Sequence, residues 1–204
     1  MSFLLRVELP DVPGSLGRLA TRIGEAGGDI EAIEIVEKRD DVAVDDVLLE
    51  LVPGTMPDTI VSACHATPGV RVLWISRYAA GGQLFLDLEA VEELTASPTQ
   101  AINRLVDLLP VTFRADWAAR VHRSDGIMHA TDAAPAELPF VEVVRSQRAQ
   151  RAEIDGDDNN VYAAVDLSDG EVVLLGRRGG PEFLDSELAR VGHLAALAVG
   201  IARP

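Results

Sequence analysis

The sequence predicts an α+β protein with two domains, at residues 1–80 and 81–204. Residues 3–77 are expected to form strand, helix, strand, strand, helix and strand in that order. A run of small residues at 79–82 then reads as a linker. The rest predicts helices, five or six antiparallel strands and a closing helix. A chain of 204 residues is long enough for one or two domains of ordinary size.

Composition limits the classes of function. Hydrophobic residues make up 48% of the chain, which is enough for packed cores. Asp and Glu number 33 against 18 Lys and Arg, so the formal net charge is −15. Such a charge repels nucleic acid and the anionic surface of a membrane. We therefore expect no nucleic-acid partner and no membrane partner.

Cysteine usage and the apolar pattern point to a cytoplasmic protein without a cofactor. Cys64 is the single cysteine, so neither an intrachain disulfide nor a thiolate zinc cluster can form. The chain has no apolar run of the roughly 18 residues that a membrane-spanning helix needs. From Phe3 onward the chain alternates like a strand and lacks the basic start of a secretory leader.

The first strand and the first helix meet at a sharp turn. Residues 3–9 alternate large apolar side chains, and a D-V-P-G turn follows at 11–14. In this turn Pro13 fixes one φ angle, and Gly14 tolerates a conformation that other residues avoid. Asp11 can hydrogen-bond the backbone ahead of it. The pattern therefore predicts that a helix begins directly after Gly14.

Periodicity and breaking residues define the other elements of this domain. They are expected at 16–26 (helix), 30–38 (strand), 42–52 (strand), 57–67 (helix) and 70–77 (strand). The strand at 30–38 carries apolar residues on both faces, with Ile33 and Ile35 opposite Val36. An exposed edge of this kind invites pairing with another chain. We therefore expect a homodimer formed through this strand.

This order of elements is that of a ferredoxin-like βαββαβ domain. The segments L-P-D-V-P-G-S-L at 9–16 and A-G-G-D-I at 26–30 resemble the ACT domain, a regulatory module of amino-acid metabolism. The resemblance covers residues 3–78. It implies allosteric binding of a free amino acid or a similar small metabolite, held between this loop and the second strand of a neighbouring chain.

The resemblance also implies a set of ligand-binding residues. The candidates are Asp11, Val12, Pro13, Gly14, Ser15 and Leu16 from one chain, with Asp29 and Ile30 from its partner. The first N–H groups of a helix suit a carboxylate, and Asp11 can hold an ammonium group. A purely structural role for Asp11 and Gly14, as turn and cap residues, stays open.

The second domain begins with helices. Residues 84–94 have helical spacing, and Ser97-Pro98 marks the start of another helix, which Pro110 is expected to end. Residues 113–121 then alternate as a strand, with Phe113 and Trp117 on the same face. A hairpin turn at 124–126 leads into a short strand at 127–130.

The end of the chain carries a second resemblance. Residues 131–160 show no clear pattern, strands at 161–167 and 171–177 flank a turn at 168–170, and a helix covers 188–201. The segment E-V-V-L-L-G-R-R-G-G-P-E-F-L-D-S-E-L at 171–188 resembles the end of a GAF domain. The likeness extends over 160–202 and, more loosely, over 98–130. It implies a GAF-like sensor with an antiparallel sheet and flanking helices, and it specifies no ligand.

No other pattern in the sequence indicates catalysis or metal binding. The histidines, His65, His122, His129 and His193, form no recognised metal or nucleophile motif. The acidic loop at 155–160 lacks the spacing of a calcium hand. We therefore predict a non-catalytic, amino-acid-binding regulatory protein. Two alternatives stay open: an enzyme with its active site within residues 98–202 of the C-terminal domain, under allosteric control of the first domain, and a ligand-free dimerisation or adaptor module.

Overall fold

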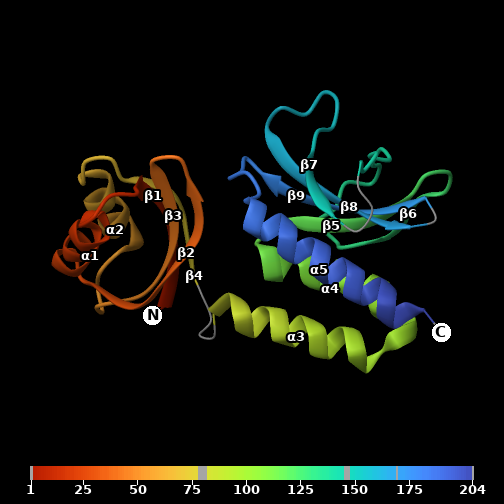
Figure 1. Ribbon diagram of the computed structural model, residues 1–204, viewed down its shortest axis with the longest axis horizontal. Coiled ribbons are helices and arrows are strands. Elements are labelled where there is room, and N and C mark those ends of the chain that lie inside the picture. The colour runs from red at the N-terminus through yellow and green to blue at the C-terminus, as the bar shows by residue number, and fades with distance from the viewer. Residues whose placement is uncertain (1, 78–81, 145–147, 169, 204) are drawn as a thin grey trace. The chain divides into compact units, whose positions relative to one another are not determined.

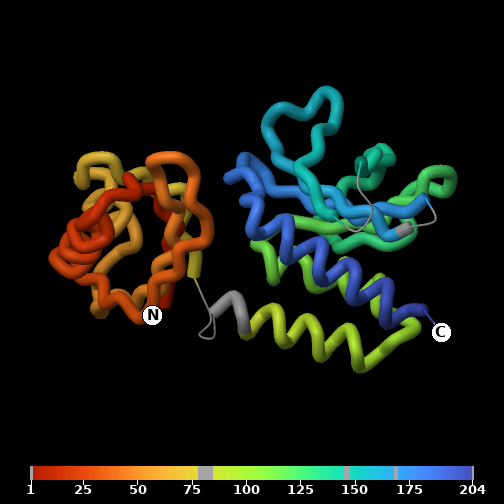
Figure 2. Tube along the Cα trace, in the orientation of Figure 1, coloured from red at the N-terminus to blue at the C-terminus, as the bar shows by residue number. Residues whose placement is uncertain are grey.

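The structure is a computed structural model that describes residues 2–77, 82–144, 148–168 and 170–203. The chain divides into two compact units, Met1–Ala80 and Gly81–Pro204, shown as ribbons in Figure 1 and as a trace in Figure 2. Most of the expected linker at 79–82 lies outside the described residues, as does Asp169 of the expected turn at 168–170. Both units are α+β, and each contains one antiparallel sheet.

Unit 1 has the element order expected from its sequence. Its elements are β1 (Ser2–Pro10), α1 (Ser15–Glu25), β2 (Gly28–Arg39), β3 (Val42–Leu51), α2 (Pro57–His65) and β4 (Arg71–Arg77). The strands form an antiparallel sheet in the order β2-β3-β1-β4. Helices α1 and α2 cover one face of this sheet (Figure 1).

The core of unit 1 lies between that face and the two helices. It contains Leu5 and Val7 of β1, Val47 of β3, Ile23 of α1 and Cys64 of α2, all fully buried. Burying side chains of this size contributes about 1.5–3 kcal/mol each to folding. In β3, every second side chain, including Val47, points toward the helices. The residue-by-residue pairing of β3 with β1 determines which side chains these are.

Strand β2 is an edge of the sheet, and its side chains do not alternate as the sequence suggested. Register shifts interrupt its pairing with β3 between Ile30 and Ala32 and again between Ile35 and Glu37. Ile30 and Ile33 consequently both pack against the core, whereas strict alternation places them on opposite faces. Each shift inserts an extra residue into β2 relative to β3, so the side chains that follow it change faces.

Unit 2 packs helices against a five-stranded sheet. Its helices are α3 (Gly82–Ala96), the 3-10 turn η1 (Pro98–Gln100), α4 (Ala101–Phe113) and α5 (Asp185–Ala202). Its strands are β5 (Trp117–His122), β6 (Gly126–Ala130), β7 (Ala149–Ala152), β8 (Asn160–Ser168) and β9 (Glu171–Arg178), arranged β6-β5-β9-β8-β7. The helices lie on one face (Figure 1), and apolar residues of the segment 134–143 pack on the other.

Two sequence expectations for unit 2 are wrong. Pro110 does not end α4, which continues to Phe113 and stops where Arg114 adopts a left-handed φ of 51°. The missing N–H bond and the ring of Pro110 weaken the helix there, but the buried Phe113 ring anchors the last turn in the core. The strand expected from 113 therefore begins at Trp117. Strand β7 was not predicted, because four residues are too few to show a periodicity.

Candidate functional site

The turn between β1 and α1 places Gly14 where its sequence predicts, directly before the helix. The Asp11 N–H donates to the Asp41 carbonyl at 2.8 Å, and the Val12 N–H donates to the Pro10 carbonyl at 2.9 Å. Gly14 occupies the N-cap position of α1 with a φ of 87°. This positive φ, which L side chains rarely adopt, explains the glycine. Residues 11–14 are exposed, so the turn faces solvent.

The N-terminus of α1 has no side-chain cap. Among the described residues no side-chain cap is formed there, and no acidic residue lies in the first turn; the Ser15 N–H donates to the Val12 carbonyl at 3.1 Å. The buried Ser15 hydroxyl instead accepts a hydrogen bond from Nη2 of Arg18 at 2.9 Å. Leu16 packs against the core and so serves the fold. The partial positive charge of this helix end is therefore not neutralised by an acidic side chain of its own turn.

Asp11 pairs with a residue that the sequence did not indicate. Nζ of Lys38, on β2, lies 2.9 Å from each carboxylate oxygen of Asp11. The expected hydrogen bond from the Asp11 side chain to the backbone ahead is not formed at the α1 cap. Lys38 is the only lysine of the sequence and is 27 residues away, so only the β2–β3 register brings it to this turn. Both side chains of the pair are partly exposed.

A second carboxyl group, that of Asp45, lies on the helix-facing side of the same end of the sheet. Asp45 of β3 pairs with Val7 of β1, and its exposed fraction is 2%. Its Oδ1 atom has no hydrogen-bond partner among the described residues. Burial raises the pKa of Asp45; Lys38 opposes this shift, whereas Asp11 and Asp46 add to it. This carboxyl was not among the residues predicted from the sequence.

The remaining predicted residues, Asp29 and Ile30, lie at the opposite end of the sheet in the same chain. Asp29 pairs with Glu50, which in turn pairs with Ser2 at the beginning of β1. Asp11 instead follows Pro10, at the end of β1. One chain therefore brings residues 11–16 together but does not place Asp29 and Ile30 beside them.

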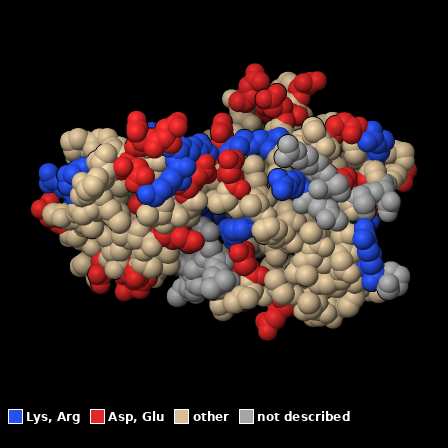
Figure 3. All heavy atoms as spheres, viewed as in Figure 1, with Lys and Arg blue, Asp and Glu red and all other residues tan. Residues whose placement is uncertain are grey.

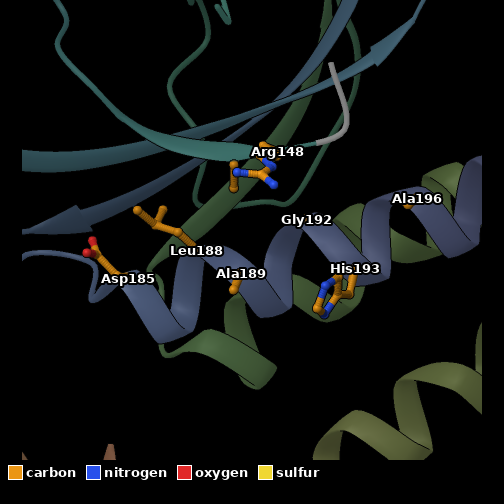
Figure 4. Close-up of a pocket in the computed structure, with 8 residues that line it drawn as sticks. Arg148, Asp185, Leu188, Ala189, Gly192, His193 and Ala196 are labelled. Atoms are coloured by element: carbon orange, nitrogen blue, oxygen red, sulfur yellow. The ribbon is translucent and has the colours of Figure 1, made fainter. Parts of the chain in front are cut away.

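Unit 2 contains a groove of about 560 Å³ along α5. Its lining residues are Arg148, Ala149, Asp185, Leu188, Ala189, Gly192, His193 and Ala196. Figure 4 shows Asp185 at the start of α5 and His193 two turns further along the helix. Asp185 is already held by Arg151 at 2.8 Å. The polar groups of the groove are thus spread along it and do not converge on one point.

A Ser-His-Asp cluster in unit 2 lacks the geometry of a nucleophile. Ser124 Oγ and Asp125 Oδ2 both lie 3.1 Å from the same ring nitrogen, Nδ1 of His122. A catalytic triad uses the two ring nitrogens separately, one for serine and one for the carboxylate. Within the described residues, no cluster of His, Cys, Asp and Glu could hold a metal ion, and no helix is long and apolar enough to cross a membrane.

Comparison with known proteins gives short or distant similarities. No family model matches the chain. A stretch of 73 residues is 33% identical to NAD-dependent malic enzyme 1 of Bacillus subtilis, covering 35% of this chain and 17% of the enzyme. The chain therefore spans a small part of that relative.

Two solved structures are also similar. The GAF domain of an Acinetobacter phosphoenolpyruvate-protein phosphotransferase has a TM-score of 0.45 and 12% identity, over 61% of this chain and 94% of that one. A formyltetrahydrofolate deformylase from Pseudomonas putida KT2440 has a TM-score of 0.31 and 8% identity, over 38% of this chain and 29% of that one. None of these similarities assigns the chain to a family.

Proposed function

We propose that the chain is a non-catalytic regulatory protein whose first unit binds a free α-amino acid. In this proposal unit 1 is a ferredoxin-like ACT module and unit 2 is a GAF-like sensor. One observation carries the proposal: Asp11, whose exposed carboxylate pairs with Lys38, belongs to the turn that leads into the N-terminus of α1, and that N-terminus has no side-chain cap. An α-amino acid presents an ammonium and a carboxylate on one carbon, and this turn offers a partner for each.

The pairing of Asp11 with Lys38 is compatible with ligand entry. An ion pair between partly exposed side chains contributes only about 0–1 kcal/mol to stability. The ammonium of a ligand can therefore replace Lys38 at Asp11 at little cost. On the face shown in Figure 3, acidic side chains are spread over both units, in keeping with the formal net charge of −15.

A homodimer completes the proposed site. Strand β2 is an edge, and two copies can pair it antiparallel about a two-fold axis near its centre. Because β2 runs from Gly28 to Arg39, that pairing sets the partner's Asp29 opposite Lys38. The residues that lie far apart in one chain would thus meet across the interface. Light scattering is expected to give the mass of a dimer. The mass of a monomer would contradict the claim that a second chain completes the site.

A thermal-shift screen with the twenty amino acids tests the function. A ligand at about 100 times its dissociation constant stabilises the protein by about 2.7 kcal/mol, which raises the melting temperature. Each amino acid that stabilises the chain is compared with its amine lacking the carboxylate and its acid lacking the amine. We expect both analogues to lose the effect. Stabilisation by neither amino acids nor their analogues would rule the proposal out.

The match to a malic enzyme favours a second candidate, in which the chain carries catalytic activity itself. The matched stretch is 17% of that enzyme, so catalysis by this chain is a proposal that needs its own test. The distinguishing assay follows NAD reduction by the full chain with malate, with and without a divalent metal ion. We expect no reduction above the protein-free rate, and turnover would establish the enzyme alternative.

A further inference from the structure

The buried carboxyl of Asp45 has one oxygen atom whose hydrogen bonding the described residues do not satisfy. Its Oδ1 atom is without a hydrogen-bond partner among the described residues, although the residue is only 2% exposed. Such a group destabilises a protein, because burial removes its water and nothing replaces it. The neighbouring Asp46 differs, since Arg6 satisfies it with two hydrogen bonds of 2.7 and 2.8 Å.

The position of Asp45 links it to the turn at 11–14. Along β3, Ala43 and Asp45 lie in the row that faces the helices, and β1 continues from Val7 and Leu9 beside them toward Asp11. Lys38 pairs with Ala43 from the other side, and its side chain reaches Asp11. The lysine thus crosses the end of the sheet next to Asp45.

Charge then identifies the kind of ligand. Asp11 and Asp45 face a single lysine, so the group carries one uncompensated negative charge when both carboxyls are ionised. A neutral amino acid uses Asp11 and the helix end and leaves Asp45 unpaired. An amino acid with a cationic side chain brings a third group, and this group matches Asp45 in charge and in hydrogen bonding.

We propose that Asp45 is a specificity-determining residue of the turn site, and that the ligand is an α-amino acid with a cationic side chain. The α1 N-terminus receives the carboxylate, Asp11 receives the α-ammonium and Asp45 receives the side-chain cation. The proposal rests on the amino-acid-binding function given above. It adds to that function the class of side chain that the site selects.

Calorimetric titration of the full chain with matched pairs of amino acids tests this assignment. Arginine is compared with its neutral isostere citrulline, and lysine with norleucine. Wild type is expected to bind the cationic member of a pair about tenfold to a hundredfold more tightly. Asp45→Asn is expected to bring this ratio close to one while α-amino-acid binding remains. Asp58→Asn, an exposed position in the first turn of α2, should leave the ratio unchanged.

The outcomes separate this inference from the proposed function. If wild type binds norleucine and citrulline as tightly as lysine and arginine, the role of Asp45 is overturned and amino-acid binding stands. If the cation preference survives Asp45→Asn, the role of Asp45 is again overturned. If no amino acid binds, the proposed function fails as well. Should Asp45→Asn not fold, the wild-type preference must still decline as acid protonates Asp45, and a preference independent of pH contradicts the inference.

Discussion

Arg177 and Glu187 form a buried ion pair at the start of α5, with Nη2 of Arg177 2.8 Å from Oε1 of Glu187. The same arginine donates to the Phe113 carbonyl and lies over the Phe183 ring, 3.9 Å from its centroid. Glu187 also accepts the Leu184 N–H at 2.8 Å, which caps α5. The pair therefore joins the end of α4, strand β9 and the start of α5.

Replacing Glu187 with Ala should strongly destabilise unit 2, because Arg177 is left as a buried charge without its carboxylate. We expect a loss of about 3–5 kcal/mol in the free energy of unfolding. Denaturant titrations in a Trp74→Phe background measure it, since Trp117 then reports on unit 2 alone. Arg151→Ala, which breaks a more exposed pair with Asp185, should cost at most about 1 kcal/mol. Equal losses for the two variants would refute the structural importance of the buried pair.

Two glycine substitutions in unit 2 should act in opposite directions. A Cβ atom at Gly176 would lie 2.3 Å from Cε2 of Trp117, so Gly176→Ala must displace a buried indole. We expect a destabilisation of about 1–3 kcal/mol. Gly200 in α5 has nothing within 4 Å of such an atom, and Gly200→Ala should stabilise the helix by up to about 1 kcal/mol. The denaturant midpoints of unfolding of the two variants, compared with wild type, test both predictions. An unchanged midpoint for Gly176→Ala would mean that the Trp117 indole is not packed against Gly176.

The thiol of Cys64 should be unreactive in the folded protein. Burial raises its pKa to about 11, and the residue is 0% exposed in the core of unit 1. Little thiolate therefore exists near pH 8, and no reagent reaches it. Labelling with a thiol reagent should follow the unfolding of unit 1 as denaturant is added. Complete labelling on mixing in native buffer would contradict the packing of α2.

Asp45→Asn should stabilise unit 1 at neutral pH. Burial raises the pKa of Asp45 above its ordinary value of 3.8, so ionisation opposes folding. This penalty is absent at pH values below the unfolded pKa and develops as the pH rises through the folded pKa. We expect a gain in stability near pH 7 that shrinks as the pH falls toward the ordinary carboxyl pKa. Asp46→Asn, which breaks the pair with Arg6, should destabilise instead, and the same sign for both variants would be inconsistent with this picture.

Local signals explain why much of unit 1 could be predicted. Pro10, Gly14 and the glycines at 27–28 mark element ends, and the order of elements follows from them. Such local signals do not predict which residues far apart in the sequence form pairs. Lys38 meets Asp11 only through the strand register. One signal for Asp45 was present. Two adjacent aspartates in a strand point to opposite faces, so one of Asp45 and Asp46 had to face the helices.

The irregular part of unit 2 was harder to predict, since its packing is not periodic. In the segment 134–143 the partly buried Leu138 and Phe140 pack against the core without forming a strand. Arg114 ends α4 in a left-handed conformation. Because this residue is not a glycine, the sequence gives no local signal for the end of the helix. Tertiary contacts of Phe113 decide where the helix stops, and sequence periodicity alone does not contain them.

Side-by-side calorimetric titration of wild type and Asp11→Ala with each amino acid tests the central claim most directly. We expect at least one amino acid to bind wild type at or below millimolar concentration. Asp11→Ala should weaken that binding by about tenfold to a hundredfold, because it removes the partner of the α-ammonium. Asp58→Ala, an exposed residue of the same unit, should bind like wild type. If no amino acid binds wild type, or if Asp11→Ala binds equally well, Asp11 and Gly14 serve only the turn.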